Sequence, residues 1–201
     1  MMPLLLLAGA YLLGGVPFGY LLVRLKTGRD VRSMGSGNIG ATNVLRTSGR
    51  ALGILTLALD VAKGYVAVWT AGRFTGNDPL WMSGAAFAVV LGHAFPIYLK
   101  FRGGKAVASC VGAFLCLAPL AVAAVTVVFV VTVAWGRYIS LGSIVGAGLL
   151  PVAVWMILHP PTPVVASAFL CGLFIIWRHK SNLARLRAGT ENVFSWRSKK
   201  S

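Results

Sequence analysis

The sequence has 201 residues, of which 57% are hydrophobic and 11% are charged, whereas a soluble domain carries about 25% charged residues. In a soluble protein, the formal net charge of +15 would indicate nucleic-acid binding. Here, however, no basic and aromatic segment outside the apolar runs is typical of a nucleic-acid-binding module. Apolar runs of about 20 residues recur along the chain, so we expect an integral membrane protein whose cations lie beside anionic lipid headgroups.

The apolar runs predict an all-α fold in one domain over residues 1–201, a polytopic bundle of about seven transmembrane helices. The run over residues 106–134 is too long for one span, and Pro119 near its middle predicts a break between two short helices. The expected spans cover residues 4–23, 51–71, 80–98, 106–134 with its break, 139–158 and 164–177.

The orientation follows from the cationic residues. With seven spans, all of the 19 Lys and Arg residues except Lys63 and Arg73 lie on one side of the membrane. The positive-inside rule then places the N-terminus outside and the C-terminus in the cytosol. Six spans would put Arg137 or the basic tail on the wrong side, so the charges independently favour the break at Pro119.

A glycine-rich segment, Gly35–Gly40, follows the first span. It matches the pattern GxGxxG, but no buried strand precedes it, which excludes a dinucleotide site. Its glycines would let backbone N–H groups approach an anion, and the next residues can begin a short helix whose N-terminus favours phosphate. We expect a phosphate site here, against the alternative of an interfacial turn without a ligand. The candidate contacts are Ser36, Gly37, Asn38, Thr42, Asn43 and Arg46.

A second candidate phosphate loop precedes the fourth span. Gly103 and Gly104 stand before the expected helix start, with Lys105 in its first turn, so free amides, the helix dipole and an ammonium group would converge. A cation at a helix N-terminus is otherwise unfavourable, which indicates an anion between them. The alternative is a plain positive-inside loop.

The basic tail holds His179 and Asn182, which share a face if the segment is helical. Histidine can transfer protons near neutral pH, but the segment could equally be an amphipathic tail on the membrane surface. Asp60 and Lys63 lie within the second span at a spacing that favours a structural ion pair. His93 has a packing or a catalytic role. Neither a metal nor another cofactor is expected, since no Cys, His or carboxylate cluster has metal-ligand spacing.

Four segments together resemble the bacterial acyl-phosphate:glycerol-3-phosphate acyltransferase family. They are GSGNIGATNVLR from Gly35, DVAKG from Asp60, HAFPIYLKFRGGKAVA from His93 and RHKSNLARLRAG from Arg178. Ala106 stands where many members are expected to carry another glycine.

The resemblance implies a multi-pass enzyme of the bacterial inner membrane with a cytosolic active site. It would transfer a fatty acyl group from acyl phosphate to the sn-1 hydroxyl of glycerol 3-phosphate, giving lysophosphatidic acid and inorganic phosphate. The implied partners are these substrates, membrane lipids and, transiently, an enzyme that produces the acyl phosphate.

The resemblance also assigns roles. Ser36, Asn43, Arg46 and Lys105 would bind phosphate, completed by the amides of Gly103 and Gly104. His179 and Asn182 would contact the glycerol phosphate or the reacting groups, and Asp60, Lys63, His93 and Glu191 would support the site.

Three mechanistic alternatives and two rival functions stay open. In direct transfer, the proton acceptor is a substrate phosphate oxygen or His179, with the substrate favoured. A covalent acyl intermediate on Ser36 is less favoured, because no base is evident beside it in the sequence. The rival functions are a transporter for a phosphate-bearing solute, against which no inverted repeat is visible, and a structural subunit.

Overall fold

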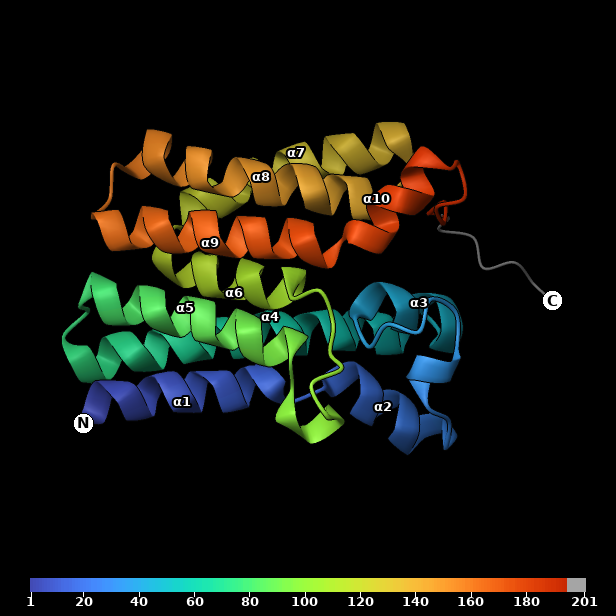
Figure 1. Ribbon diagram of the computed structural model, residues 1–201, viewed down its shortest axis with the longest axis horizontal. Helices are drawn as coiled ribbons and strands as arrows, with labels where there is room; N and C mark the ends of the chain where they lie inside the picture. Colours follow the sequence, from blue (N-terminus) through green and yellow to red (C-terminus); the bar gives the residue numbers. More distant parts are fainter. Residues whose placement is uncertain (195–201) are drawn as a thin grey trace. The chain divides into compact units, whose positions relative to one another are not determined.

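The computed structural model describes residues 1–194, and within this range all regular structure is helical. The chain divides into two compact units at the junction of Leu117 and Ala118, which are described separately below. Figure 1 shows the helices of both units in chain order. The predicted all-α class is therefore confirmed for the described residues.

The first unit contains six α-helices and two short 3₁₀ helices. They are α1 (Met2–Gly15), α2 (Phe18–Thr27), η1 (Val31–Ser33), α3 (Ala41–Ser48), α4 (Arg50–Thr75), α5 (Pro79–Ala94), η2 (Ile97–Leu99) and α6 (Val107–Leu117). A break at Val16 and Pro17 separates α1 from α2, because proline lacks the N–H that a continuous helix would use.

Glycines allow the long helices of the first unit to pack closely. A Cβ atom on Gly14 of α1 would overlap the backbone of Val89 on α5, and one on Gly64 of α4 would overlap the backbone of Ser109 on α6. Small residues at such crossings are typical of helices that associate inside a bilayer, where van der Waals contact replaces the hydrophobic driving force.

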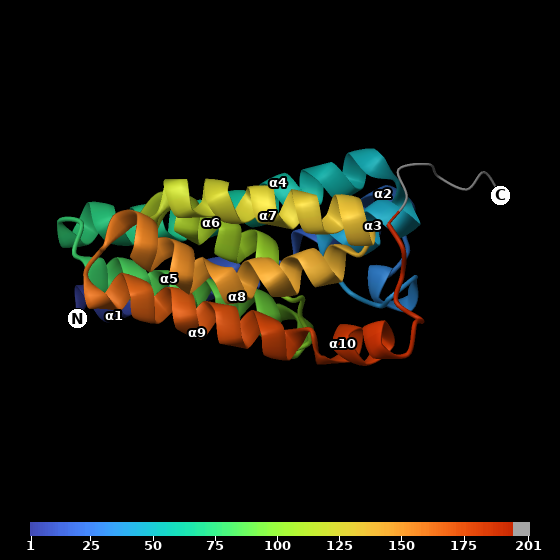
Figure 2. The ribbon, with the colours of Figure 1, turned by 90° about the horizontal axis from the view of Figure 1, so that it is seen from above.

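The second unit contains α7 (Pro119–Gly136), α8 (Ile139–Leu158), α9 (Thr162–Arg178) and α10 (Lys180–Arg187). The first three are apolar helices that pack in sequence, α7 against α8 and α8 against α9. The chain bends by 54° between α9 and α10, at His179, and Figure 2 shows this bend in a second view.

The predicted break is confirmed, since α6 ends at Leu117 and α7 begins at Pro119. Five segments of the described chain are long and apolar enough to cross a membrane, with α1 and α2 taken together, and a sixth is the bent pair α9 and α10. Helix α6 is apolar but shorter. The count of seven spans and the orientation of the termini remain predictions.

Candidate functional site

The loop between α2 and α3 is built around residues in the left-handed backbone region. Gly28 ends α2 with φ of 70°, and Gly35 and Gly37 have φ of 57° and 70°. A residue with a Cβ atom is strained in this region, so the glycines permit the turns. Asp30 begins η1 by accepting the N–H of Arg32, and the Arg32 guanidinium holds the pKa of the Asp30 carboxyl below its ordinary value.

Asn43 on α3 holds this loop together from inside. Its Nδ2 atom donates to the carbonyl oxygens of Val31, Met34 and Asn38 at 3.3, 3.1 and 2.8 Å. Its Oδ1 atom accepts the N–H of Ser36 at 2.9 Å. The side chain is buried, so the geometry gives Asn43 the role of positioning the loop, and its predicted phosphate contact stays a prediction.

The remaining candidates of the first loop lie around this buried amide. Ser36, Gly37 and Arg46 are exposed, and Thr42 is partly buried. Asn38 accepts the N–H of Gly40 at 2.8 Å and so orders the residue that directly precedes α3. The exposed hydroxyl of Ser36 and the guanidinium of Arg46 are therefore the groups of this loop best placed to meet a ligand.

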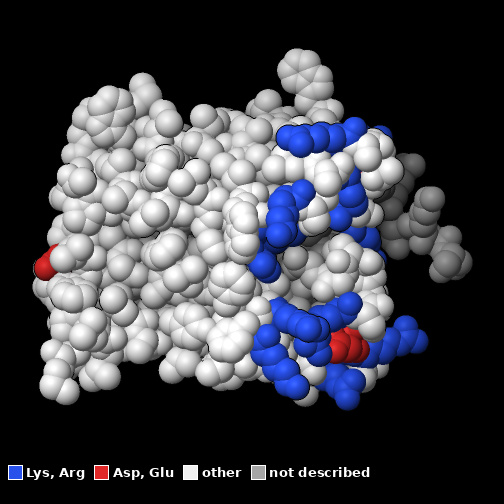
Figure 3. Space-filling view, in the orientation of Figure 1, with Lys and Arg blue, Asp and Glu red and all other residues white. Residues whose placement is uncertain are grey.

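The two candidate phosphate segments share one small hydrophobic cluster. Ile39 and Val44 of the first segment pack with Val31 of η1, with Val23 of α2 and with Leu99, which directly precedes the second segment. Residues 35–46 and 100–105 are thereby held at the same end of the first unit. Over this unit, the visible Lys and Arg side chains gather toward the end that carries α2 (Figure 3).

The second segment is tightly folded against the end of α5. Lys100, Phe101 and Ala106 all have positive φ, of 52°, 61° and 61°. The N–H groups of Gly103 and Gly104 donate to the carbonyl oxygens of Ala94 and His93, at 3.1 Å in both cases. Backbone strain of this kind, which costs about 1–3 kcal/mol per residue, tends to gather at functional sites.

Two expectations for this segment need correction. Helix α6 begins at Val107, so Lys105 lies before the helix instead of in its first turn. The amides of Gly103 and Gly104 donate to α5, so glycine is needed here for space. A Cβ atom on Gly103 would overlap the carbonyl oxygen of His93, and one on Gly104 would overlap the His93 ring.

A buried polar network lies beneath the second segment. The predicted pair is present, with Lys63 Nζ 2.8 Å from Asp60 Oδ1. His93 Nδ1 lies 3.6 Å from the same oxygen and 3.0 Å from the Ser109 hydroxyl. Lys63 also donates to the Val16 carbonyl at 2.9 Å. Ser109 and Val16 were not foreseen, because partners far apart in sequence leave no local pattern.

The second unit places His179 and Asn182 at the bend between α9 and α10, and both are buried. His179 Nδ1 lies 2.8 Å from the Ile175 carbonyl oxygen. Because a carbonyl only accepts, Nδ1 carries the proton of the neutral ring and Nε2 is the nitrogen that can accept one. His179 directly precedes α10 and Asn182 lies within it, so the expected helix is present, and the role of the two residues stays a prediction.

Glu191 fixes Asn182 within the second unit. Its Oε1 atom accepts from Asn182 Nδ2 at 2.8 Å and from the Ser140 hydroxyl at 3.0 Å, and Oε2 accepts from Arg185 Nε at 2.8 Å. Burial raises the pKa of this carboxyl, but the three donated hydrogen bonds outweigh it and leave the pKa below its ordinary value. Ser140 and Arg185 were not foreseen.

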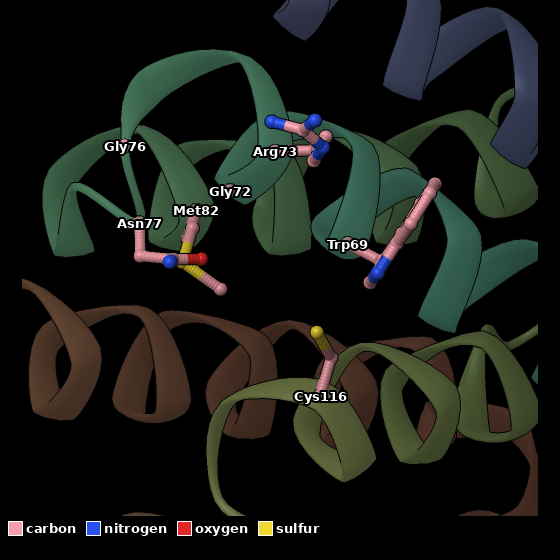
Figure 4. Close-up of a pocket in the computed structure, with 7 residues that line it drawn as sticks. All are labelled: Trp69, Gly72, Arg73, Gly76, Asn77, Met82 and Cys116. Atoms are coloured by element: carbon pink, nitrogen blue, oxygen red, sulfur yellow. The ribbon is translucent and has the colours of Figure 1, made fainter.

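A cavity of about 300 Å³ lies at the other end of the first unit. Trp69 and Arg73 of α4, Met82 of α5 and Cys116 of α6 line it together with Asn77 and two glycines (Figure 4). Helix α4, from Arg50 to Thr75, is about 39 Å long at 1.5 Å per residue. The cavity lies near its C-terminal end and is therefore remote from the glycine-rich segments.

Comparison with known proteins identifies a family for this chain. A profile of the family "Glycerol-3-phosphate acyltransferase" matches residues 4–189. The proteins of that name from Trichlorobacter lovleyi and Geobacter metallireducens are 48% and 50% identical, over 94% and 95% of this chain and 95% and 97% of theirs.

The fold has solved counterparts. The crystal structure of PlsY (YgiH), an integral membrane glycerol 3-phosphate acyltransferase, in its glycerol 3-phosphate form has a TM-score of 0.92 and 36% identity, over 97% of this chain and 96% of PlsY. Its lysophosphatidic acid form has a TM-score of 0.89 and 34% identity over the same shares of the two chains. This chain belongs to the glycerol-3-phosphate acyltransferase family.

Proposed function

We propose that this protein transfers a fatty acyl group from acyl phosphate to the sn-1 hydroxyl of glycerol 3-phosphate. The products are lysophosphatidic acid and inorganic phosphate, and the reaction is the first acylation of phospholipid synthesis. The observation that carries the proposal is the pair of cationic, glycine-rich segments held on one hydrophobic cluster, since both substrates are phosphates. Family membership and the ligands named for the PlsY structures support it.

The reaction is a direct displacement at the acyl carbon. The sn-1 oxygen bonds to the carbonyl carbon, the bond between that carbon and the bridging phosphate oxygen breaks, and phosphate leaves with the electron pair. Ser36, Arg46 and Lys105 orient the phosphates and stabilise the charge that develops on the leaving group. An acyl phosphate is a mixed anhydride, so its leaving group needs little further activation.

The hydroxyl proton passes to a phosphate oxygen of a substrate in this scheme. His179 is the alternative acceptor through Nε2, because its Nδ1 is committed to the Ile175 carbonyl. The variant His179→Gln separates the two. A loss in kcat of more than about a thousandfold, at normal protein levels and with one limb of the pH profile gone, would assign the proton to His179.

The proposed setting is the bacterial inner membrane. Seven spans would place both glycine-rich segments and the basic tail on the cytosolic side, where soluble glycerol 3-phosphate is available. The acyl chains of donor and product would stay in contact with lipid, and an enzyme that makes acyl phosphate would dock transiently at the same side. This orientation can be tested with a membrane-impermeant thiol reagent and a single cysteine introduced at residue 36 or at residue 77. We expect the cysteine at residue 77 to react from outside.

Turnover without a sealed membrane tests the enzymatic assignment. Protein purified in detergent should release phosphate from acyl phosphate only when glycerol 3-phosphate is present, and Lys105→Met should abolish this release while the protein stays folded. A carrier for a phosphate-bearing solute would show no chemical change in detergent, and a structural subunit would tolerate Lys105→Met.

A further inference from the structure

The buried network of Asp60, Lys63, His93 and Ser109 connects two backbone features that lie far apart in sequence. Three different helices supply its side chains, α4, α5 and α6. Asp60 and Lys63 are 3% and 2% exposed in their side chains. Ionisable groups buried at this depth are costly, so their presence here indicates a specific use.

One end of the network holds the break between α1 and α2. Lys63 Nζ donates to the carbonyl oxygen of Val16, which lies between the last residue of α1 and Pro17. The same carbonyl accepts the N–H of Phe18 at 3.1 Å, so the turn at Pro17 and the Lys63 ammonium share one acceptor. Lys63 therefore fixes the point from which α2 leads into the first glycine-rich segment.

The other end holds the second glycine-rich segment. His93 is oriented through Nδ1 by Ser109 at 3.0 Å and by Asp60 at 3.6 Å. Its own carbonyl accepts the N–H of Gly104, and its ring lies directly against Gly104, where no Cβ atom would fit. The position of the His93 ring thus limits the position of the residue before Lys105.

We propose that Asp60, Lys63, His93 and Ser109 are positioning residues that set the relative placement of the two phosphate segments. This inference rests on the proposed function for its kinetic readout. The network carries no proton in the reaction; it holds the Val16 carbonyl at one end and the backbone around Gly104 at the other. It predicts that a protein in which the network is replaced by well-packed apolar side chains stays stable but binds its substrates poorly.

The test separates stability from positioning by comparing single and double replacements. Lys63→Met alone leaves a buried unpaired carboxylate and should clearly lower the midpoint of thermal unfolding. The pair Asp60→Leu with Lys63→Met removes both charges and should recover most of that loss, because apolar replacements of a buried ion pair are often neutral. Thermal unfolding in detergent measures both.

The double variant should nevertheless keep a KM for glycerol 3-phosphate raised by about tenfold or more, with a smaller change in kcat. Two buried serines give a matched control. Ser109→Ala removes a contact of His93 and should raise KM, whereas Ser83→Ala in α5, whose hydroxyl has no partner within residues 1–194, should not. Recovery of KM together with stability in the double variant would overturn the proposal.

Hydrogen exchange keeps the inference separate from the proposed function. The amides of Gly103 and Gly104 should exchange faster in the double variant than in the wild type without any substrate. If the wild-type protein fails to use acyl phosphate, the proposed function fails, while this exchange still decides whether the network holds the segment. An unchanged exchange rate of these amides in the double variant would refute the positioning role.

A second inference comes from the cavity at the far end of α4. That helix is about 39 Å long, which exceeds the roughly 30 Å hydrocarbon core, so an α4 that spans the bilayer places its two ends in opposite headgroup layers. Arg73 lines the cavity and makes neither a hydrogen bond nor an ion pair within residues 1–194. The nearby Asp78 carboxylate caps the N-terminus of α5, where it accepts the N–H of Leu80 at 2.8 Å.

We infer that this cavity binds the phosphate of an anionic lipid headgroup. The guanidinium of Arg73 supplies the charge, Asn77 supplies an amide, and Trp69 has the amphipathic ring that is typical of the interface. The location in a headgroup layer favours a lipid over a free anion. This site takes no part in the proposed reaction.

Quenching of Trp69 by brominated lipids tests the inference. The difference between wild type and Trp69→Phe isolates the signal, which should be quenched more by brominated phosphatidylglycerol than by brominated phosphatidylcholine. Arg73→Gln should abolish the preference, and Arg137→Gln, an exposed arginine at the end of α7, should keep it. Equal quenching by the two lipids in the wild type, or loss of the preference on adding inorganic phosphate, would overturn the lipid assignment.

Discussion

Replacing Asn43 by alanine should loosen the first glycine-rich segment without unfolding the protein. The side chain of Asn43 closes this segment from inside through one accepted hydrogen bond, from Ser36, and three carbonyl contacts on Nδ2. Alanine removes all of them while leaving α3 intact, since alanine favours helix. The segment should therefore sample open conformations more often in the ligand-free protein.

The size of the effect follows from the geometry. The two hydrogens on Asn43 Nδ2 are shared among three carbonyl oxygens, and Oδ1 accepts one backbone N–H. The alanine variant therefore loses about three hydrogen bonds, at about 1 kcal/mol each. Water reaches the partly buried carbonyls of Met34 and Asn38 once the segment opens, which reduces the cost to about 2–3 kcal/mol. At 1.4 kcal/mol per factor of ten, opening should become about 30 to 150 times more frequent.

Hydrogen exchange of residues 35–40 in the absence of substrate is the direct assay, accompanied by kcat and KM for glycerol 3-phosphate. Asn43→Asp sharpens the comparison, because it keeps the acceptor for Ser36 but places a carboxylate against three carbonyls and should loosen the segment further. If Asn43→Ala lost activity while exchange over residues 35–40 stayed at the wild-type rate, Asn43 would be a substrate ligand and the reasoning would fail.

Three further predictions concern single residues. Gly103→Ala should abolish activity, because the new Cβ would overlap backbone oxygens of His93 and Ala94 that cannot rotate away, and steady-state kinetics on folded protein would check this. Ala106→Gly should preserve activity and stabilise by up to about 1 kcal/mol in thermal unfolding, since alanine at φ of 61° is strained by about 1–2 kcal/mol and the added chain entropy offsets part of the relief; a clear loss of stability would contradict it. Glu191 has a folded pKa below its ordinary value of 4.5, so its stabilisation is complete above that pH and is lost as the pH falls through the folded pKa; Glu191→Gln should flatten this part of the acid unfolding curve, and an unchanged curve would refute the assignment.

Local features of the sequence were sufficient to predict most of the fold. Apolar length predicted the helices, and proline predicted the break before α7 because a missing N–H is a purely local property. The spacing of Asp60 and Lys63 likewise predicted an ion pair on one helix face. The expectation that Ala106 replaces a glycine agrees with its positive φ, which a local motif can encode.

Long-range contacts could not be read in the same way. Nothing near Lys63 in sequence indicates that its ammonium reaches Val16, and nothing near Glu191 indicates Ser140, because these partners meet only through helix packing. The amides of Gly103 and Gly104 illustrate the converse error. A glycine pair before a helix is typical of anion binding, but here carbonyl oxygens at the C-terminal end of α5 accept both N–H groups.

The identity of the acyl donor tests the account most directly. Purified protein is supplied with glycerol 3-phosphate and either palmitoyl phosphate or palmitoyl-CoA, and the release of phosphate and the formation of lysophosphatidic acid are followed together. We predict equal amounts of both products from palmitoyl phosphate and none from the thioester. Lysophosphatidic acid formed from palmitoyl-CoA, with palmitoyl phosphate left unused in every lipid condition, would contradict the proposal that two phosphates meet at the paired glycine-rich segments.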